Sequence, residues 1–244
     1  MCSTRPSAMR RLLKACAAVA MAATLAIAGL SVLAHASADA MTCDSDTPYV
    51  GGLDQLAGWG LLFQEEYDDA DPDPELLPAW DYSEEEFSIG TYDDASAALV
   101  QGRGFLDFLR PWTDYATVTR LSVMAGSVTL SYRRNEGGRY FVEIAPDSAL
   151  VYLGKTHILP GRPRGWAQRD HVASAPLPLV FGEWYEVAVI GDGATIEVLI
   201  DGVSVLTFVD PDPWLEGGIG FETIGDAPHV IVDFVRAWCP GTAE

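Results

Sequence analysis

The sequence predicts an all-β protein, a two-sheet antiparallel β-sandwich that follows an N-terminal signal helix. Two observations carry this prediction. From residue 61 onward, short apolar or alternating runs are separated by clusters of turn residues, and no stretch keeps a helical period. Hydrophobic residues make up 49% of the 244 residues, which is enough to form a sizeable core. Many short strands with frequent turns are typical of a sandwich or a barrel.

Residues 1–40 have the pattern of a secretory signal peptide. The basic segment Met9–Lys14 precedes an apolar run over residues 15–34, and small-residue cleavage patterns end at Ala38 and Ala40. The alternative is an uncleaved membrane anchor, because the run is long enough to span a bilayer. Its high alanine content and the tandem cleavage patterns favour removal. We therefore expect a secreted, extracellular protein with no membrane association after cleavage at Ala38 or Ala40.

Residues 41–60 are rich in glycine and lack periodicity, so we expect a linker or an edge strap before a sandwich domain over residues 61–240. Alternation and turn residues place the strands of that domain. The expected strands are Leu61–Tyr67, Phe87–Tyr92, Ala97–Gln101, Tyr115–Val123, Val128–Arg133, Tyr140–Ile144, Ala149–Leu153, Trp184–Ile190, Thr195–Ile200, Ser204–Val209, Ile219–Thr223 and His229–Trp238.

Turn chemistry fixes several connections between these strands. The segment Asn135–Gly138 joins two of them, and Asp201 with Gly202 forms a two-residue hairpin that needs positive φ at both positions. Three consecutive strands between Trp184 and Val209 are thus expected to form a meander. One long segment, residues 155–178, has no strand pattern, and we expect a long and functional loop there.

The cysteines agree with export. Cys43 and Cys239 lie near the two ends of the mature chain, and two cysteines in an exported domain usually pair. A disulfide between them would close nearly the whole domain. The loop-entropy model gives such a bridge about 5 kcal/mol.

The charge excludes several kinds of partner. The formal net charge is −20, and removing the four bases and one acid of residues 1–40 leaves −23. Such an acidic surface repels phosphate backbones, which argues against nucleic acid and anionic lipid. The sequence also contains no glycine-rich phosphate loop, no Cys-x-x-Cys pair, no Gly-x-Ser-x-Gly elbow and no zinc-type histidine spacing.

Motifs in the C-terminal half resemble a known fold family. They are Trp184–Val189, Ile196–Gly202, Gly217–Phe221 and Val232–Val235, and a looser match begins at Leu62. Over roughly residues 61–239 the chain resembles concanavalin A-like lectin and glucanase domains, which have a jelly-roll fold. The bacterial group named 3-keto-disaccharide hydrolases is the most similar. The resemblance implies a carbohydrate partner, either an oligosaccharide or a polysaccharide.

The catalytic motif of laminarinase-type glucanases of this fold has no convincing counterpart. That motif, Glu-x-Asp-x-x-Glu, holds two carboxyls about 5–5.5 Å apart on one strand. The nearest segment, Glu66–Asp71, ends in aspartate and runs directly into Pro72 and Pro74, which would break a strand. We therefore assign no catalytic residue.

Four residues are candidates for contacts with sugar: Trp112, Arg133, Glu143 and Trp166, joined by His157 or His171 from the long loop. Aromatic rings can stack on sugar faces, while arginine and glutamate bind hydroxyl groups. The alternative is that Trp112 belongs to the core and that Arg133 pairs with a neighbouring acid.

An acidic segment suggests a calcium site. Asp68, Asp69, Asp71 and Asp73 offer the oxygen ligands that Ca²⁺ prefers, and the last strand could add Asp233. The alternative is an acidic surface loop stiffened by prolines.

Three hypotheses for function follow. The first is a secreted carbohydrate-binding module that recognises glycan on a concave sheet face. The second is a glycoside hydrolase of the 3-keto-disaccharide hydrolase type, and the third is a structural or adhesion domain without a small ligand. The sequence leaves open whether the protein is an enzyme, with binding favoured over catalysis, and it leaves the oligomeric state open.

Overall fold

A computed structural model describes Leu56 and residues 59–67, 81–82, 87–92, 95–102, 105–158 and 167–239. The chain divides into two units, residues 1–40 and residues 41–244, and every described residue belongs to the second unit. The signal peptide expected over residues 1–40 lies outside the described residues.

The described chain is almost entirely strand, which confirms the all-β prediction. The 3₁₀ turn η3 covers Pro146–Ser148. No helix in the described ranges is both long and apolar enough to cross a membrane. The strands are β1 (Gly60–Glu65), β2 (Asp81–Tyr82), β3 (Phe87–Tyr92), β4 (Ala95–Gln101), β5 (Phe105–Phe108), β6 (Ala116–Arg134), β7 (Gly138–Ala145), β8 (Leu150–Ile158), β9 (Ala167–Pro176), β10 (Trp184–Asp192), β11 (Thr195–Ile200), β12 (Val203–Val209) and β13 (Gly218–Cys239).

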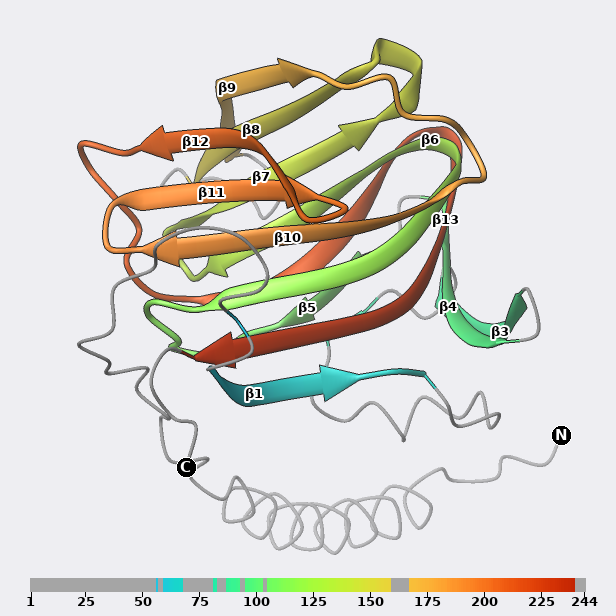
Figure 1. Cartoon of the computed structure of the whole chain (residues 1–244), viewed down its shortest axis with the longest axis horizontal. Coiled ribbons are helices and arrows are strands. Elements are labelled where there is room, and N and C mark those ends of the chain that lie inside the picture. The colour runs from blue at the N-terminus through green and yellow to red at the C-terminus, as the bar shows by residue number, and fades with distance from the viewer. Residues whose placement is uncertain are drawn as a thin grey trace, which may run out of the picture. The chain divides into compact units, whose positions relative to one another are not determined.

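Two long strands, β6 and β13, pair antiparallel along their lengths and run through both layers of the sandwich (Figure 1). Each was expected as two separate strands, and that expectation is wrong. Their pairing continues across an irregular stretch between Ile224 and His229, where the register shifts. Gly126 lies in this stretch with φ +71°, and a Cβ there would come within 2.7 Å of the Ile224 carbonyl oxygen. A side chain at this position would therefore collide with the partner strand.

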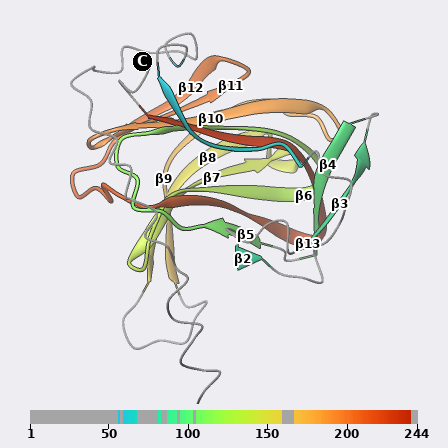
Figure 2. The ribbon, with the colours of Figure 1, turned by 90° about the horizontal axis from the view of Figure 1, so that it is seen from below.

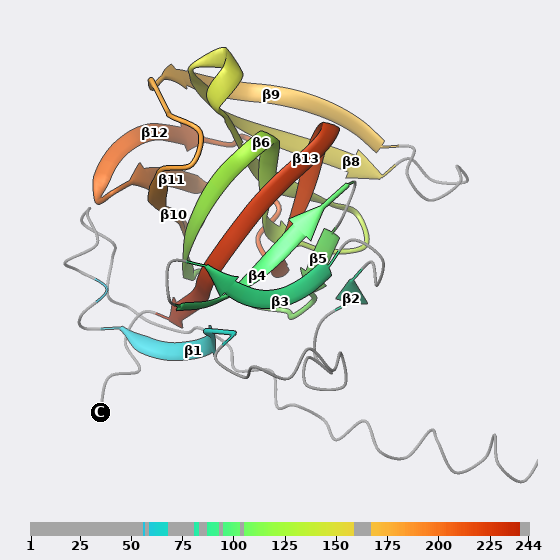
Figure 3. The same cartoon turned by 90° about the vertical axis from the view of Figure 1, so that its right-hand side faces the viewer.

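One end of the β6–β13 pair belongs to the first sheet, where the strand order is β12-β11-β10-β6-β13. Beyond β13, β4 pairs with His229–Val232 and β3 pairs with β4, while β1 pairs with the end of β13 (Figure 3). The expected meander of β10, β11 and β12 is confirmed.

The other end of the same pair belongs to the second sheet. There β5 pairs with β13 and with β2, while β7, β8 and β9 follow β6 in succession (Figure 2). Every strand pair is antiparallel. The two-sheet sandwich expected from the sequence is therefore confirmed, with β6 and β13 shared between the sheets.

The core lies between the two sheets. Alternate residues of β10 and β11, such as Val189 and Val198, pack in one buried cluster with alternate residues of β7 and β8, such as Val142 and Leu153. The face shared by Ile196, Val198 and Ile200, expected from their period-two spacing, belongs to this core.

The outer face of the first sheet is apolar and covered. Ala116, Val118, Ala188 and Leu199 form a second buried cluster with Leu56 and Trp59, which precede β1. The described part of the segment expected as a linker or strap thus packs on this face. A large ligand cannot reach the sheet where these side chains cover it.

The prediction of a long loop over residues 155–178 is wrong for most of that range. Strands β8 and β9 pair from Leu150 with Pro176 to Ile158 with Ala167. This segment was interpreted as a loop because β9 begins with an exposed run of polar residues, residues 168–171, that lacks the alternation of a half-buried strand. Residues 159–166, between the two strands, lie outside the described residues.

Candidate functional site: a polar face on the second sheet

The outer face of the second sheet carries polar side chains in register. Thr129 of β6 lies opposite Glu222 of β13 on one side and Glu143 of β7 on the other. In the neighbouring row, Ser131 lies opposite Phe141. The residues between these, such as Leu130 and Val142, are in the core. Because side chains alternate across a strand, the row of Thr129 points away from the core.

Phe141 and the two hydroxyl residues form the floor of this face. The Phe141 ring lies over Gly154 of β8, where a Cβ would come within 1.9 Å of its Cζ. Thr129, Ser131 and Phe141 are all buried although they face outward, because longer side chains cover them.

Two arginines lie across this floor. Arg139 donates a hydrogen bond of 2.8 Å to the Ser131 hydroxyl and pairs with Glu222 through its other terminal nitrogen. Arg169 donates a hydrogen bond of 2.9 Å to the Thr129 hydroxyl, and the same Nη2 lies 3.3 Å from Glu143. Its guanidinium carbon lies 4.1 Å from the centroid of the Phe141 ring.

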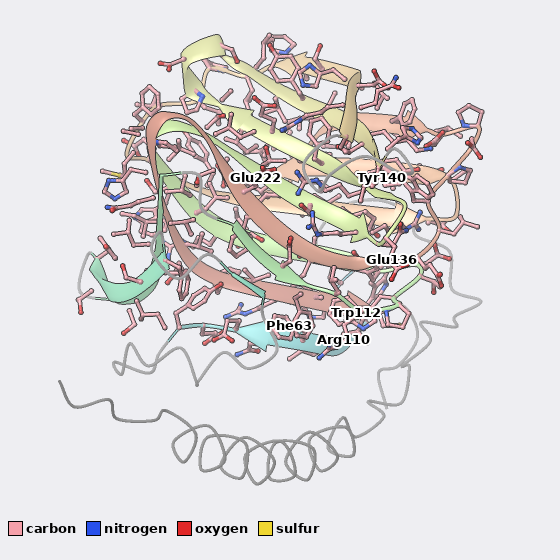
Figure 4. The ribbon with its side chains drawn as sticks, turned by 180° about the vertical axis from the view of Figure 1, so that it is seen from behind. Phe63, Arg110, Trp112, Glu136, Tyr140 and Glu222 are labelled. Carbon is pink, nitrogen blue, oxygen red and sulfur yellow. The ribbon has the colours of Figure 1, made fainter. Side chains whose placement is uncertain are left out.

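An aromatic pair borders the arginines. The rings of Tyr152 and His171 stack with centroids 4.5 Å apart and planes at 19°. His171 also meets Phe141 edge-on, and its Nε2 lies 3.6 Å from Glu143. We call the whole set the polar face: Thr129, Ser131, Arg139, Phe141, Glu143, Tyr152, Arg169, His171 and Glu222. Figure 4 shows Glu222 on its strand among the side chains of this region.

The electrostatics of the polar face centre on Arg169. Burial lowers the pKa of Arg169, Glu143 and Glu222 raise it, and Arg139 lowers it again. The net pKa of Arg169 is below its ordinary value. The guanidinium is therefore a partly desolvated cation, a state that favours contact with an anion.

Of the four ligand candidates from the sequence, Glu143 lies on the polar face, and Trp166 falls outside the described residues. Trp112 is buried, with its ring centroid 5.6 Å from that of Phe108 and 5.4 Å from that of Tyr115. Figure 4 shows it beside Phe63 and Arg110 near β1. Trp112 is a core residue in this structure and offers no face to a sugar.

Arg133 is also enclosed, with 0% of its side chain exposed. It donates hydrogen bonds to the carbonyl oxygens of Gly193 at 2.7 Å and Trp214 at 3.0 Å, and it pairs with Asp114 at 2.7 Å. These bonds tie together three connecting segments at one end of the sandwich. Arg133 holds the fold there and cannot reach a ligand.

A second polar cluster is buried between β7, β8 and the segment after β12. Asp210 accepts hydrogen bonds from Lys155 at 2.8 Å and from the Tyr140 hydroxyl at 2.6 Å. Lys155 also bonds the Asp212 carbonyl oxygen, and Tyr140 accepts a bond from the Trp214 amide. These contacts hold residues 210–214 against the sheet, so the cluster has a structural role.

The expected metal ligands Asp68, Asp69, Asp71 and Asp73 lie outside the described residues. The fifth, Asp233, pairs with Arg120 at 2.5 Å. Within the described ranges no group of three or more histidine, cysteine or acidic side chains could hold a metal ion. Cys239 is buried at the end of β13, and its expected partner Cys43 is outside the described residues.

Sequence reasoning missed Arg139, Tyr152, Arg169 and Glu222 as residues of one site. The signal was present in β7, where Arg139, Phe141 and Glu143 alternate with core residues. It was hidden in β9, which was interpreted as a loop, and in β13, where Glu222 is separated from Glu143 by 79 positions of sequence.

No family model matches this sequence, and no curated protein does so either. Solved structures do match. The GH16 protein of the Bacteroides ovatus mixed-linkage glucan PUL, solved with its G4G4G3G product, aligns with TM-score 0.56 at 12% identity, over 72% of this chain and 99% of that one. The laminarinase catalytic domain of Thermotoga maritima aligns with TM-score 0.54 at 12% identity, over 74% and 98%. The module CBM66 of Bacillus subtilis aligns with TM-score 0.48 at 16% identity, over 64% and 94%.

The first two of these structures define the class of fold. This chain has the concanavalin A-like jelly-roll fold, as its sequence motifs indicated. At 12% identity the similarity establishes the fold alone, and the site must be argued from its own residues.

Proposed function

We propose that this protein is an exported carbohydrate-binding module that holds glycan on the polar face. The observation that carries the proposal is the convergence of Arg139, Arg169, Glu143 and Glu222 beside the stacked rings of Tyr152 and His171. Planar charged groups bind sugar hydroxyls in pairs, and aromatic rings supply apolar contact. The jelly-roll fold and the carbohydrate-related names of two structural neighbours, a mixed-linkage glucan protein and a laminarinase, support this reading.

Binding is favoured over hydrolysis by the surroundings of the two glutamates. Glu143 and Glu222 lie on strands separated by β6, so their backbones are roughly 10 Å apart at ordinary strand spacing. Each contacts an arginine. Retaining hydrolysis needs two carboxyls about 5–5.5 Å apart that flank one glycosidic bond, whereas here each carboxylate is directed to its own arginine. The 3-keto-disaccharide hydrolase alternative therefore has no support from these residues.

Export remains part of the proposal. Residues 1–40 would direct the chain out of the cell and be removed after Ala38 or Ala40. In the oxidising environment outside, Cys43 would pair with Cys239. Gly60 lies opposite Cys239 in the pairing of β1 with β13, so the start of the described domain reaches the end of its last strand. A bridge there would fasten the entering segment to the sheet.

A calcium ion in the acidic segment around Asp71 also remains a proposal. Its support is the density of carboxylates between Asp68 and Asp73. Asp233 is a poor fifth ligand, because its Oδ2 is already bonded to Arg120. A site there would draw its ligands from the segment itself.

The proposal is tested by a glycan array probed with the purified protein, first with calcium and then with a chelator, followed by analysis of each bound glycan for released products. Saturable binding without products supports a binding module. Loss of binding on chelation would support a metal ion near the ligand. Released sugar would overturn the non-catalytic assignment, and silence across the array would favour a structural or adhesion role.

A further inference from the structure

Arg169 differs from the other paired cations of the protein. In the part of the chain that the structure describes, the remaining ion pairs of lysine and arginine have N–O distances of 2.8 Å or less. The distance between Arg169 and Glu143 is 3.3 Å. Among these paired cations of the described residues, Arg169 is therefore the one whose charge is least closely matched by an acid.

The hydrogen-bonding capacity of Arg169 is also mostly unused. Both of its hydrogen bonds, to Thr129 and Glu143, come from Nη2. Nε and Nη1 carry three further N–H donors, and these have no hydrogen-bond partner among the described residues. By contrast, Arg139 engages both terminal nitrogens and has only 11% of its side chain exposed. Arg169 has 31% exposed.

The guanidinium of Arg169 is held in place by residues of the sheet beneath it, Phe141 and Thr129. Its guanidinium carbon lies 4.1 Å from the centroid of the Phe141 ring, and Thr129 holds its Nη2. A cation held in this way loses little conformational entropy when an anion binds. Planar guanidinium groups recognise carboxylates and sulfates through paired hydrogen bonds.

We propose that Arg169 recognises the acidic group of an anionic glycan, either the carboxylate of a uronic acid or a sulfate ester. This inference rests on the proposed function and narrows its ligand class. The acidic group accepts hydrogen bonds from the unused N–H groups of Arg169. It competes with the Glu143 carboxylate for the positive charge of Arg169, while Glu143 stays near His171. Glu143 thus weakens the binding of anionic glycan and sets its selectivity.

The net charge, −23 once residues 1–40 are removed, does not oppose this inference at close range. At physiological ionic strength charges farther apart than about 8 Å are largely screened, so local contacts decide the affinity. The overall charge slows the approach of a polyanion and favours short or sparsely charged glycans.

The test uses a short oligogalacturonide and a short, singly sulfated galactan oligosaccharide, each compared with its carboxyl-reduced or desulfated counterpart, and measures the affinity of the purified protein for all four. We expect at least one charged glycan to bind roughly ten-fold or more tightly than its neutral counterpart, as one charge-assisted hydrogen bond requires. Tighter binding of the carboxylated glycan would identify a uronic acid as the ligand, and tighter binding of the sulfated glycan would identify a sulfate ester. Arg169→Gln should abolish the preference, whereas Glu143→Gln should strengthen binding of the charged glycan.

Arg120→Gln is the matched control, since Arg120 lies over an aromatic ring, that of Trp184, on the other sheet. It should leave the preference unchanged. Arg169→Lys keeps the charge but loses the planar fork, so it should restore only part of the preference. Circular dichroism of each variant separates loss of binding from loss of fold.

Equal binding of charged and neutral glycans, or a preference that survives Arg169→Gln, would overturn the inference and leave the proposed function intact. Absence of binding to these four glycans and to every glycan of the array would overturn both.

Discussion

The ring of Phe141 lies directly over Gly154, so that a Cβ on Gly154 would come within 1.9 Å of Cζ. Phe141 on β7 and Gly154 on β8 lie directly opposite each other in the pairing of these neighbouring strands. Glycine is required here because the ring occupies the space of a side chain. The close contact with Gly154 determines how near the Phe141 ring lies to the sheet. It thereby determines the position of the Arg169 guanidinium, which packs on the ring.

Replacing Gly154 by alanine should therefore disturb both stability and binding. The new methyl group must displace the Phe141 ring, and overpacking of this kind costs about 1–3 kcal/mol in the free energy of unfolding. Urea unfolding measures the cost. The control is Gly193→Ala, because a Cβ at Gly193 meets no atom within 4 Å, although its φ of +52° adds backbone strain of about 1 kcal/mol. If Gly154→Ala bound glycan like the unmodified protein, Phe141 would not position Arg169.

Arg133→Met should destabilise the fold strongly. The change removes a buried cation and leaves the Asp114 carboxylate and the carbonyl oxygens of Gly193 and Trp214 without its hydrogen bonds. The Asp114 side chain is 40% exposed and can be solvated again, but each buried carbonyl oxygen left without its partner costs about 1–3 kcal/mol, which thermal or urea unfolding detects. Where the variant stays folded, at low temperature, its glycan affinity should match that of the unmodified protein. Selective loss of affinity without loss of stability would return Arg133 to the ligand site.

Stability should fall in acid partly because of Asp210. Burial alone raises the pKa of Asp210, but hydrogen bonds from Lys155, Tyr140 and the Asp212 amide outweigh it, and the net pKa lies below the ordinary value. A carboxyl with a lowered folded-state pKa stabilises the protein above its unfolded pKa of about 3.9. That contribution is lost as the pH falls through the folded-state pKa.

Asp210→Asn removes this dependence and breaks the buried pair with Lys155. The variant should be about 3–5 kcal/mol less stable near pH 7, and it should lose less stability than the unmodified protein between pH 5 and pH 2, a window of roughly the width set by such shifts. Urea unfolding at several pH values measures both effects. Parallel stability profiles for the two proteins would contradict the role given to Asp210.

Reduction should destabilise the exported protein through the proposed Cys43–Cys239 bridge. Cys239 is 1% exposed at the end of β13, so reduction should require partial unfolding. The bridge is worth roughly 5 kcal/mol in the loop-entropy model, and the double variant Cys43→Ser, Cys239→Ser should melt at a lower temperature. Mass spectrometry of the unreduced protein after thiol alkylation tests the pairing. Two alkylated thiols would rule it out.

The sequence predicted the fold well where alternation and turn chemistry act locally. The hairpin at Asp201 and Gly202 and the meander around it follow from φ requirements and period-two spacing, and both are present. The joining of strand halves within β6 and β13 could not be predicted in this way. Gly126 and Gly225 look like turn residues in sequence. In the structure β6 and β13 continue past these glycines, because the two strands pair with each other on both sides of them.

The site was predicted less completely, for a physical reason. Trp112 and Arg133 have side chains suited to sugars, but their burial depends on contacts with segments distant in sequence, such as Phe63 for Trp112 and Trp214 for Arg133. Glu143 was identified, but its partner Arg169 lies on a strand that was interpreted as a loop. Register across five strands decides which polar residues meet, and single-strand periodicity carries no register information.

The most direct test of the central claim compares two aromatic substitutions on opposite sheets. Tyr152→Ala removes the ring that stacks on His171 in the polar face, and Trp184→Ala removes a ring that meets Arg120 on the first sheet. Isothermal titration with the glycan bound most tightly in the array gives the affinity of each variant. We predict that Tyr152→Ala weakens binding about ten-fold, a change of 1.4 kcal/mol, and that Trp184→Ala leaves it within about two-fold of the unmodified protein. Strong loss with Trp184→Ala, together with unchanged affinity for Tyr152→Ala, would place the ligand elsewhere and contradict the account.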